Sequence, residues 1–254
     1  MLIKTPIRTI SHRHPGTQPR HARLADAAMQ ASAIELMGAC MSFAANAEIY
    51  GENEPADYLY KVVSGTVRTY KVLVDGRRQI EAFHLRGDIF GFETGDEHAF
   101  SAEAITDCKI TVIKRSAVMA LAARDNDVAR QMWALTAREL QRVQEHSLVL
   151  IKSAEERVAG FLLEMAQRLA SAGAVELPMS RQDIADYLGL TIETVSRTLK
   201  HLEDAAAIEV PKRRRILLRN RSALRRLNAR RRAAEGTIRG YLPSSSNSVG
   251  SLVR

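Results

Sequence analysis

The sequence has few of the features that mark disulfide-rich, membrane or secreted proteins. It contains two cysteines in 254 residues, Cys40 and Cys108, which are far apart and lack CxxC spacing. This argues against a disulfide framework and for a reducing compartment. No apolar run approaches the roughly eighteen residues of a membrane span. The basic N-terminal stretch, interrupted by three prolines, lacks the apolar core of a secretory signal. We therefore expect a cytoplasmic protein.

The motifs of common enzyme classes are also absent. The sequence contains no P-loop, HExxH, GxSxG or dinucleotide fingerprint. Its seven histidines are scattered, and the only cluster, His12, His14 and His21, lies in the N-terminal stretch, where we expect solvated side chains. We therefore predict a protein that is not an enzyme and has no catalytic residue, metal site or cofactor.

Residues 180–204 have the pattern of two short helices joined by a tight turn. Ser180, followed three residues later by Asp183, predicts a capping box at the start of the first helix. Gly189 permits the positive φ with which a chain leaves a helix, and Thr191 can cap the second helix. The pattern is that of a helix-turn-helix, whose second helix enters the major groove of DNA. The apolar positions that the two helices turn toward each other are Ile184, Leu188, Val195, Leu199 and Leu202.

Three polar residues on the outer face of the second helix are candidates for reading bases. Glu193, Ser196 and Arg197 have the spacing i, i+3, i+4. A carboxylate can accept a hydrogen bond from cytosine N4, and a guanidinium can donate two hydrogen bonds to guanine. A hydroxyl can donate or accept. Alternatively, Glu193 and Arg197 form an ordinary surface salt bridge worth about 0.3–0.5 kcal/mol. The residues predicted to contact the DNA backbone are Ser180, Arg181, Thr191, Thr194, Lys200, Arg213, Arg214 and Arg215.

The net charge of +8 is concentrated in the C-terminal part of the chain. Residues 1–150 carry 18 Lys and Arg against 18 Asp and Glu, whereas residues 151–254 carry 19 against 11. Residues 212–232 include 11 basic side chains and no acidic one. A neutral module joined to a basic one is typical of a sensor or dimerisation domain attached to a polyanion binder. The competing interpretation is a ligand-sensing module whose helix-turn-helix serves protein contacts.

The N-terminal half is predicted to be a small β-barrel or jelly roll. From about residue 43 to 113, short runs rich in β-branched and aromatic residues alternate with turn dipeptides. Asp75 and Gly76 separate two such runs and are suited to a primed hairpin turn.

From about residue 116 to 150 the apolar residues recur with the 3.6-residue period of a helix. This predicts one long helix with a single broad apolar stripe. We expect this stripe to pack against the same helix of a second chain, because palindromic DNA sites are bound by two-fold symmetric dimers. The alternative is that the stripe packs on the barrel of its own chain. The residues predicted at the dimer interface are Val128, Met132, Leu135, Leu140, Val143 and Leu150.

The rest of the pattern completes the domain organisation. The run EERVAGFLLEMAQRLA predicts a helix that opens the DNA-binding domain, IEVPKRRRILLRN a basic-tipped hairpin, or wing, and SALRRLNARRR a terminal helix. Beyond the wing, Arg230, Arg231 and Arg232 either follow flanking DNA or stay solvated. The predicted parts are a flexible basic arm (1–24), a β-roll (25–115), a dimerisation helix (116–150), a winged helix-turn-helix domain (151–232) and a disordered tail (233–254).

This order of barrel, long helix and winged helix-turn-helix resembles the CRP/FNR superfamily of bacterial transcription regulators. The stretches NAEIYGE, DYLYKVVSGTVRTYKVLVDGRRQI, FSAEAITDCKITVIKRS and YLGLTIETVSRTL look like its FixK branch. The resemblance covers about residues 43–228. It implies an α+β fold with an N-terminal β-roll of the cyclic-nucleotide-binding type, a long dimerisation helix and a C-terminal winged helix-turn-helix.

The resemblance also implies a DNA site and a set of partners. FNR-like members carry Glu-x-x-Ser-Arg in the recognition helix, which corresponds here to Glu193, Ser196 and Arg197. The cAMP-responsive members have an Arg before that Glu, where this sequence has Ile192. A TTGAT-like palindrome is therefore expected. The implied partners are double-stranded DNA, a second copy of the chain and RNA polymerase, in a regulator, mostly an activator, of genes for low-oxygen metabolism or nitrogen fixation.

Two departures from the superfamily limit what the barrel can sense. Cyclic-nucleotide binders hold the phosphate with an Arg before Ser-Ala and the ribose with a Glu after a Gly. Here Phe100 and Phe92 stand at those places, and an aromatic ring cannot make the charge-assisted contact that a phosphate needs. FNR itself holds an iron–sulfur cluster, which requires about four thiolates. We expect neither cAMP nor a cluster; the alternative is another small effector that gates DNA binding.

Overall fold

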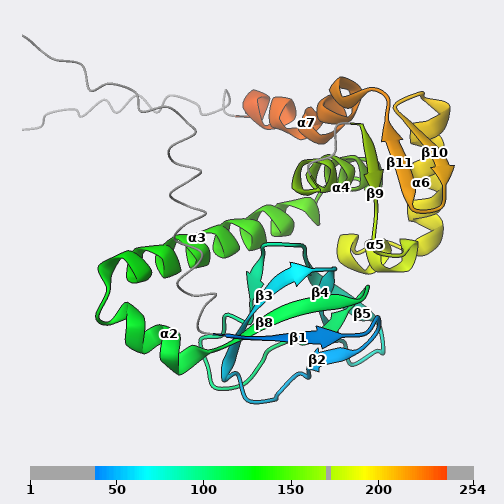
Figure 1. The fold of residues 1–254 in the computed structure, drawn as a ribbon. Helices are drawn as coiled ribbons and strands as arrows, with labels where there is room; N and C mark the ends of the chain where they lie inside the picture. The colour runs from blue at the N-terminus through cyan, green and yellow to red at the C-terminus, as the bar shows by residue number, and fades with distance from the viewer. Residues whose placement is uncertain (1–37, 170–172, 239–254) are drawn as a thin grey trace, which may run out of the picture.

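The computed structural model describes residues 38–169 and 173–238, which form a barrel, two connecting helices and a C-terminal domain (Figure 1). The predicted arm (1–24), with its three histidines, and residues 239–254 of the predicted tail lie outside the described residues. Within the described ranges, no helix is long and apolar enough to cross a membrane.

The barrel is a two-layered jelly roll of eight antiparallel strands, as the sequence pattern predicts. One sheet has the strand order β1-β8-β3-β6 and the other β2-β7-β4-β5. Inward-facing apolar residues such as Val62, Val67 and Ile110 fill the space between the sheets and are fully buried. The strands are β1 (Ala39–Phe43), β2 (Glu48–Tyr50), β3 (Tyr58–Ser64), β4 (Val67–Val72), β5 (Arg78–His84), β6 (Ile89–Phe90), β7 (Ser101–Ala104) and β8 (Cys108–Lys114).

The hairpin between β4 and β5 is present, but its turn is longer than the predicted two-residue primed turn. Leu73 N donates to Arg77 O at 2.8 Å, which leaves three residues between them. Within this turn only Gly76 has a positive φ, of 80°. A type I′ turn requires two residues with positive φ, whereas a single left-handed glycine is usual in a three-residue loop.

The helix predicted over residues 116–150 is in fact two helices, α2 (Arg115–Ala122) and α3 (Asn126–Val149). The break has a local cause at Asp125, which lies between them. Its Oδ1 accepts hydrogen bonds from Asp127 N at 2.8 Å and Val128 N at 3.3 Å. An aspartate that caps a helix in this way ends the preceding turn and starts a new helix.

The apolar stripe on α3 divides into an inward and an outward part. Val128 is 2% exposed, and Met132 packs against the buried cluster that contains Leu59 and Ile113. Both were predicted at a dimer interface, but Val128 is already buried within its own chain and Met132 packs on its own barrel. Leu135 is half-buried. Three of the residues predicted at the interface are exposed on the outer side: Leu140, Val143 and Leu150. Trp133, which was not predicted there, is exposed as well.

The C-terminal domain is a winged helix-turn-helix whose three-stranded sheet has the order β10-β11-β9. The sequence analysis missed β9 and placed the end of the last helix at 232, whereas the helix continues further. The elements are α4 (Ala154–Arg168), β9 (Ala174–Glu176), α5 (Arg181–Leu188), α6 (Ile192–Asp204), β10 (Ile208–Lys212), β11 (Arg215–Leu218) and α7 (Arg221–Ile238).

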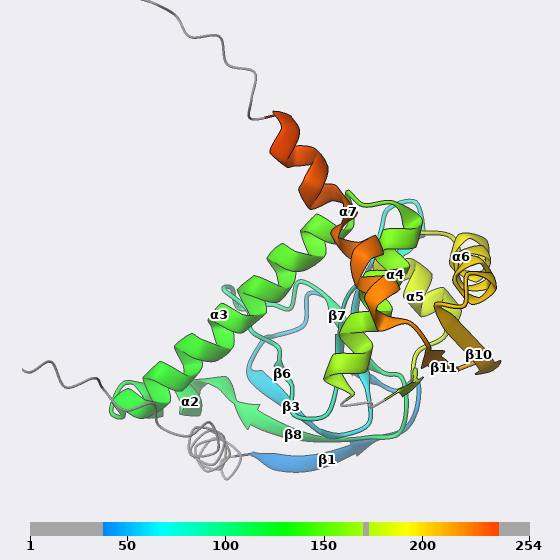
Figure 2. The same ribbon diagram turned by 90° about the horizontal axis from the view of Figure 1, so that it is seen from above.

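The barrel and the C-terminal domain share one hydrophobic core. Ile80 and Phe83 of β5 belong to the same buried cluster as residues of α4 and α5. The Phe83 ring centroid lies 5.1 Å from that of Tyr187 and 6.2 Å from that of Phe161. Figure 2 shows α4 and α5 lying over the barrel. Direct packing on the barrel therefore sets the position of the α5–α6 unit.

Candidate nucleic-acid interface

The first helix of the pair, α5, begins with the predicted capping box. Ser180 Oγ accepts from Asp183 N at 3.1 Å, and Asp183 Oδ2 accepts from Ser180 N at 2.9 Å and Ser180 Oγ at 2.7 Å. Gly189 ends the helix with a φ of 61°, and Leu190 N donates to Ala185 O at 2.9 Å. This left-handed turn sends the chain directly into α6. The Ser180 hydroxyl is committed to the cap.

The second helix, α6, is held by its inner face and exposes its outer face (Figure 1). Thr191 caps it, with Oγ1 accepting from Thr194 N at 3.2 Å. On the outer face Glu193 and Arg197 are exposed and Ser196 is half-buried. The apolar positions that face the domain core are all buried, as predicted: Val195, Leu199 and Leu202.

The charged groups on this face are available to a ligand. Hydrogen bonds from the backbone at the start of α6, and then from the Thr191 hydroxyl, hold the pKa of Glu193 below its ordinary value, so the carboxylate is ionised at neutral pH. No ion pair joins Glu193 to Arg197 in the part of the chain that the structure describes. The outer face therefore presents one acceptor and one forked donor.

Two of the residues predicted to contact phosphates bind within the chain. Arg181 Nη1 donates to the Ser196 hydroxyl at 3.4 Å, which draws this arginine alongside α6. Lys200 Nζ lies 3.1 Å from Asp204 Oδ1 and 3.4 Å from Glu203 Oε2. Exposed helical ion pairs of this kind are weak and exchange easily with other partners. The Lys200 ammonium therefore remains accessible to a phosphate, whereas Arg181 is half-buried beside α6.

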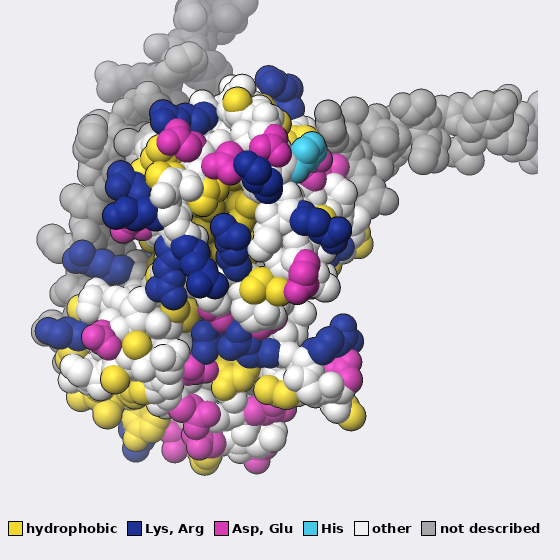
Figure 3. Space-filling view, turned by 90° about the vertical axis from the view of Figure 1, so that its right-hand side faces the viewer, with side chains coloured by type: hydrophobic (Ala, Val, Ile, Leu, Met, Phe, Trp, Pro, Cys, Tyr) yellow, Lys and Arg dark blue, Asp and Glu magenta, His cyan; other side chains and the backbone are white. Residues whose placement is uncertain are grey.

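The wing carries the other predicted phosphate contacts. Arg213 and Arg214 form its tip and Arg215 begins β11, and all three are exposed. Figure 3 shows many Lys and Arg side chains over the upper and middle parts of this side, with some Asp and Glu among them, and further Asp and Glu at its lower end. The side chains of residues 230–238 lie outside the described residues, so both alternatives for the arginines at 230–232 stay open.

A group of charged residues that the sequence analysis missed joins the barrel to α5. Arg68 and Arg78 of the barrel form ion pairs with Asp183 and Asp186 of α5. The sequence identified Asp183 only as a capping residue. An arginine within the β-rich run TVRTYKV is a signal for a buried charge, but nothing in the sequence identifies its partner more than a hundred residues away.

A cavity of about 90 Å³, open to solvent, lies between the barrel and α3, and its volume is well below the roughly 300–1,000 Å³ of a typical ligand pocket. Phe92 and Phe100 both line it. Burial raises the pKa of Glu81, which accepts from Thr69 Oγ1 at 3.0 Å. Burial likewise raises the pKa of Glu139, which reaches the cavity from α3. The cavity is small and carries acidic groups where an anion would need positive charge.

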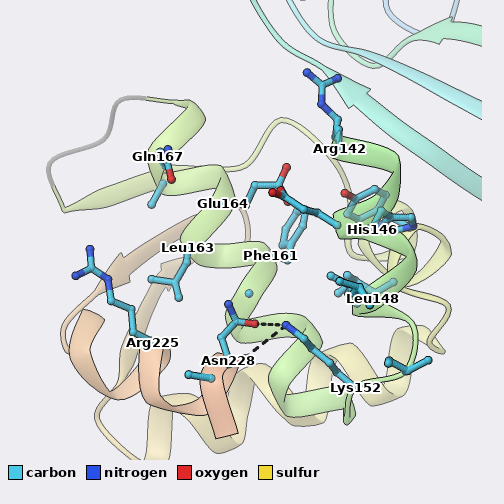
Figure 4. A pocket seen from close by; sticks show the side chains of 18 of the residues that line it. Arg142, His146, Leu148, Lys152, Phe161, Leu163, Glu164, Gln167, Arg225 and Asn228 are labelled. Atoms are coloured by element: carbon cyan, nitrogen blue, oxygen red, sulfur yellow. Dashed lines mark hydrogen bonds between the residues drawn. The ribbon is translucent and has the colours of Figure 1, made fainter. Parts of the chain in front are cut away.

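A larger cleft of about 840 Å³ lies between α3, α4 and α7 (Figure 4). Lys152 Nζ donates to Asn228 Oδ1 at 2.7 Å across its base. His146 of α3 stacks on Tyr187 with ring centroids 4.3 Å apart. Arg225 lines the cleft from α7, which packs on α4 on the side of the domain away from α6 (Figure 1).

The two cysteines lie apart in the barrel and are not bonded to each other. Cys40 on β1 is exposed, and Cys108 at the start of β8 is buried. The Cys108 thiol donates to Thr106 O at 3.0 Å, and burial raises its pKa. Within residues 38–169 and 173–238, no group of three or more His, Cys, Asp or Glu is arranged to hold a metal ion.

A winged helix-turn-helix whose recognition helix is exposed, attached to a jelly-roll barrel, defines a DNA-binding transcription regulator. Comparison with known families agrees with this class. Residues 156–227 match the Crp-like helix-turn-helix domain and residues 40–125 match the cyclic nucleotide-binding domain.

The similarity extends over most of the chain in individual relatives. The nitrogen fixation regulation protein FixK of Azorhizobium caulinodans is 48% identical over 88% of this chain and 95% of its own length. The solved structure of FixK2 from Bradyrhizobium japonicum superposes with a TM-score of 0.73 and 53% identity, over 76% of this chain and 98% of that one. The fumarate and nitrate reduction regulatory protein of Vibrio cholerae is 35% identical over 64% of this chain and 68% of its own length. The chain belongs to the CRP/FNR superfamily and, within it, to the FixK branch.

Proposed function

We propose that the chain binds a TTGAT-like palindrome as a homodimer and regulates transcription, mostly as an activator that works with RNA polymerase. The observation that carries this proposal is the outer face of α6. There Glu193 and Arg197 are exposed, and Ser196 lies beside them. This face has the chemistry of base readout, and in the described residues neither Glu193 nor Arg197 forms an intramolecular ion pair.

The positions of the exposed side chains indicate which of them contact bases and which contact phosphates. Arg197 donates two parallel hydrogen bonds to a guanine, and Glu193 accepts from a cytosine N4. The exposed arginines of the wing contact phosphates, which fix the register on the duplex without reading its sequence. Thr191, Thr194, Arg181 and Lys200 surround the same helix and add further backbone contacts.

The outward part of the α3 stripe supports the dimer. Leu140 is 59% exposed and Trp133 78% exposed, on a helix whose opposite side packs against its own barrel. A second copy of α3 would cover this row of apolar side chains. The resulting two-fold axis matches a palindromic site, in which the half-sites lie about one helical turn apart.

The target genes and the controlling signal are proposed from the relatives and from the barrel. Relatives are named for nitrogen fixation regulation and for fumarate and nitrate reduction, which supports genes of nitrogen fixation or low-oxygen metabolism as targets. The small acidic cavity supports regulation that requires no cyclic nucleotide.

A binding titration tests the proposal. The full chain, prepared in air without cAMP, is titrated against a duplex with a TTGAT palindrome and against a scrambled duplex, at the same moderate salt. We expect about a thousandfold or greater preference for the palindrome and two chains per duplex. Equal affinity for the two duplexes would refute sequence-specific recognition by this chain.

A further inference from the structure

The contact between the barrel and α5 is ionic as well as apolar, and its centre is buried. Arg68 of β4 is 9% exposed. Its Nη1 donates to Asp183 Oδ1 at 2.9 Å, and its Nη2 donates to Glu103 Oε1 at 2.7 Å. The barrel thus holds this guanidinium from one side with Glu103 and presents its other end to the helix-turn-helix.

A second arginine reaches the same helix from the neighbouring strand. Arg78 Nη2 donates to Asp183 Oδ1 at 2.6 Å, and Arg78 Nε donates to Asp186 Oδ2 at 2.8 Å. Two arginines on adjacent strands therefore meet two carboxylates one turn apart on α5. We call this set of four residues the ionic joint: Arg68, Arg78, Asp183 and Asp186.

Asp183 connects the joint to the start of the helix-turn-helix. Its Oδ1 accepts from both arginines, while its Oδ2 accepts from Ser180 in the capping box. The side chain that starts α5 is thus also the one that the barrel holds. Because α5 packs directly against α6, this carboxylate connects the barrel to the helix pair that includes the recognition helix.

The burial of the joint points to a role in orientation. Removing two charges from water is costly, so a buried ion pair adds little net stability compared with an apolar contact. It does require a specific geometry, because several directional hydrogen bonds must be satisfied at once. None of the four side chains lies on α6, so its outer face remains open.

We propose that the ionic joint positions the recognition helix, so that the two α6 helices of a dimer are held at the separation that a palindrome requires. The inference rests on the proposed function. Two half-sites lie about 34–36 Å apart on one face of the duplex. If the two recognition helices could move relative to each other, binding would fix their separation at a cost in conformational entropy. A pre-set orientation removes that cost and raises the affinity for correctly spaced sites.

Changing the spacing between the half-sites tests this role. The dissociation constants of the wild type, Arg68→Met and Arg78→Met are measured for the palindrome and for duplexes with one or two base pairs inserted between half-sites. The matched control is Arg77→Met, which removes the same charge from the same hairpin. The Arg77 side chain is 78% exposed and pairs with Asp75 on its own turn.

We expect the joint variants to lose about ten- to a hundredfold in affinity for the palindrome, within the range of coupling between distant sites. We expect a much smaller loss on the respaced duplexes, so that the preference for correct spacing is reduced. Arg78→Lys keeps the charge and should restore part of this preference. Arg77→Met should differ from the wild type by less than about twofold.

A loss of affinity that is equal on all duplexes, with the spacing preference unchanged, would overturn the proposal. A gain in affinity would also overturn it, because it would show that the joint holds the recognition helix away from the orientation that binds DNA. Binding to a duplex with a single half-site shows that each variant is folded. Failure of the proposed function is seen separately, since it is the wild type that would then show no preference for the palindrome.

Discussion

Arg181 of α5 donates a hydrogen bond to Ser196 of α6 at 3.4 Å, whereas Arg197, the next residue along α6, is exposed and has no ion-pair partner in the described residues. The two arginines lie beside the same recognition helix in different settings. Arg181 bridges α5 and α6, and Arg197 projects from the outer face of α6. This difference predicts separate roles on DNA.

Replacing Arg197 should change which sequence is bound. Arg197→Ala removes a bidentate pair to guanine, so we expect a loss of about 1–3 kcal/mol and a relaxed preference at the guanine of TTGAT. Glu193→Ala should relax the choice at the C·G or a neighbouring pair. Arg181→Ala is the control and should weaken all sequences alike. Selection from a randomised site measures this; unchanged specificity in both α6 variants would mean that neither side chain reads a base.

The wing should contribute affinity that depends on salt. Replacing Arg213, Arg214 and Arg215 by Ala removes phosphate contacts, so specific and random DNA should both bind more weakly. The slope of log Kd against log salt should flatten by about one for each phosphate that the variant no longer neutralises. The control neutralises Arg124, just before α3, and Arg130, near the N-terminal end of α3. An unchanged slope in the wing variant would mean that the wing does not touch the backbone.

An acidic side chain on the outward face of α3 should separate the dimer. Leu140→Glu would bury a charge at the centre of the interface, so we expect a monomer in sedimentation velocity experiments. Because each half-site would then be bound alone, the affinity for the palindrome should fall by about a hundredfold or more. Val74→Glu, on the exposed tip of the β4–β5 hairpin, should leave the dimer intact. A dimeric Leu140→Glu variant would contradict the assignment of this face.

DNA binding should be independent of cAMP and of an iron–sulfur cluster. The cavity between the barrel and α3 is small and lined by Glu81, Glu93 and Glu139, and the sequence has two cysteines where a cluster needs about four thiolates. We expect the same Kd for the palindrome with and without added cAMP, and before and after anaerobic treatment with iron and sulfide. A requirement for either treatment would contradict this prediction.

His84 should make the stability of the barrel depend on pH. Burial, and then the charges of Arg142 and Arg168, lower the pKa of His84 well below 6.5. Below about pH 6.5 the unfolded chain therefore binds a proton that the folded chain does not, so the free energy of unfolding falls as the pH falls. Relative to His84→Gln, the wild type should lose about 1.4 kcal/mol per pH unit below that value. Urea unfolding between pH 5 and 7.5 measures this, and parallel profiles would contradict it.

The sequence predicted the features that depend on local chemistry. The capping box at Ser180, the turn at Gly189 and the buried face of α6 follow from short-range spacing, and the structure contains all three. The break at Asp125 was also encoded locally but was obscured by the continuous apolar stripe around it. The pairing of Arg68 with Asp183 could not be predicted, because it depends on how the two domains pack. No spacing pattern in the sequence relates the two residues.

The core that Ile80 and Phe83 share with Phe161 and Tyr187 has a consequence for how the protein can be divided. Cutting the chain between α3 and α4 would expose a wide apolar surface on both fragments, which invites aggregation. The intact chain should instead melt in one cooperative step. The barrel therefore supports the recognition helix whether or not it binds a ligand. Deleting it removes the apolar surface on which α4 and α5 pack, so loss of DNA binding in such a truncation says nothing about sensing.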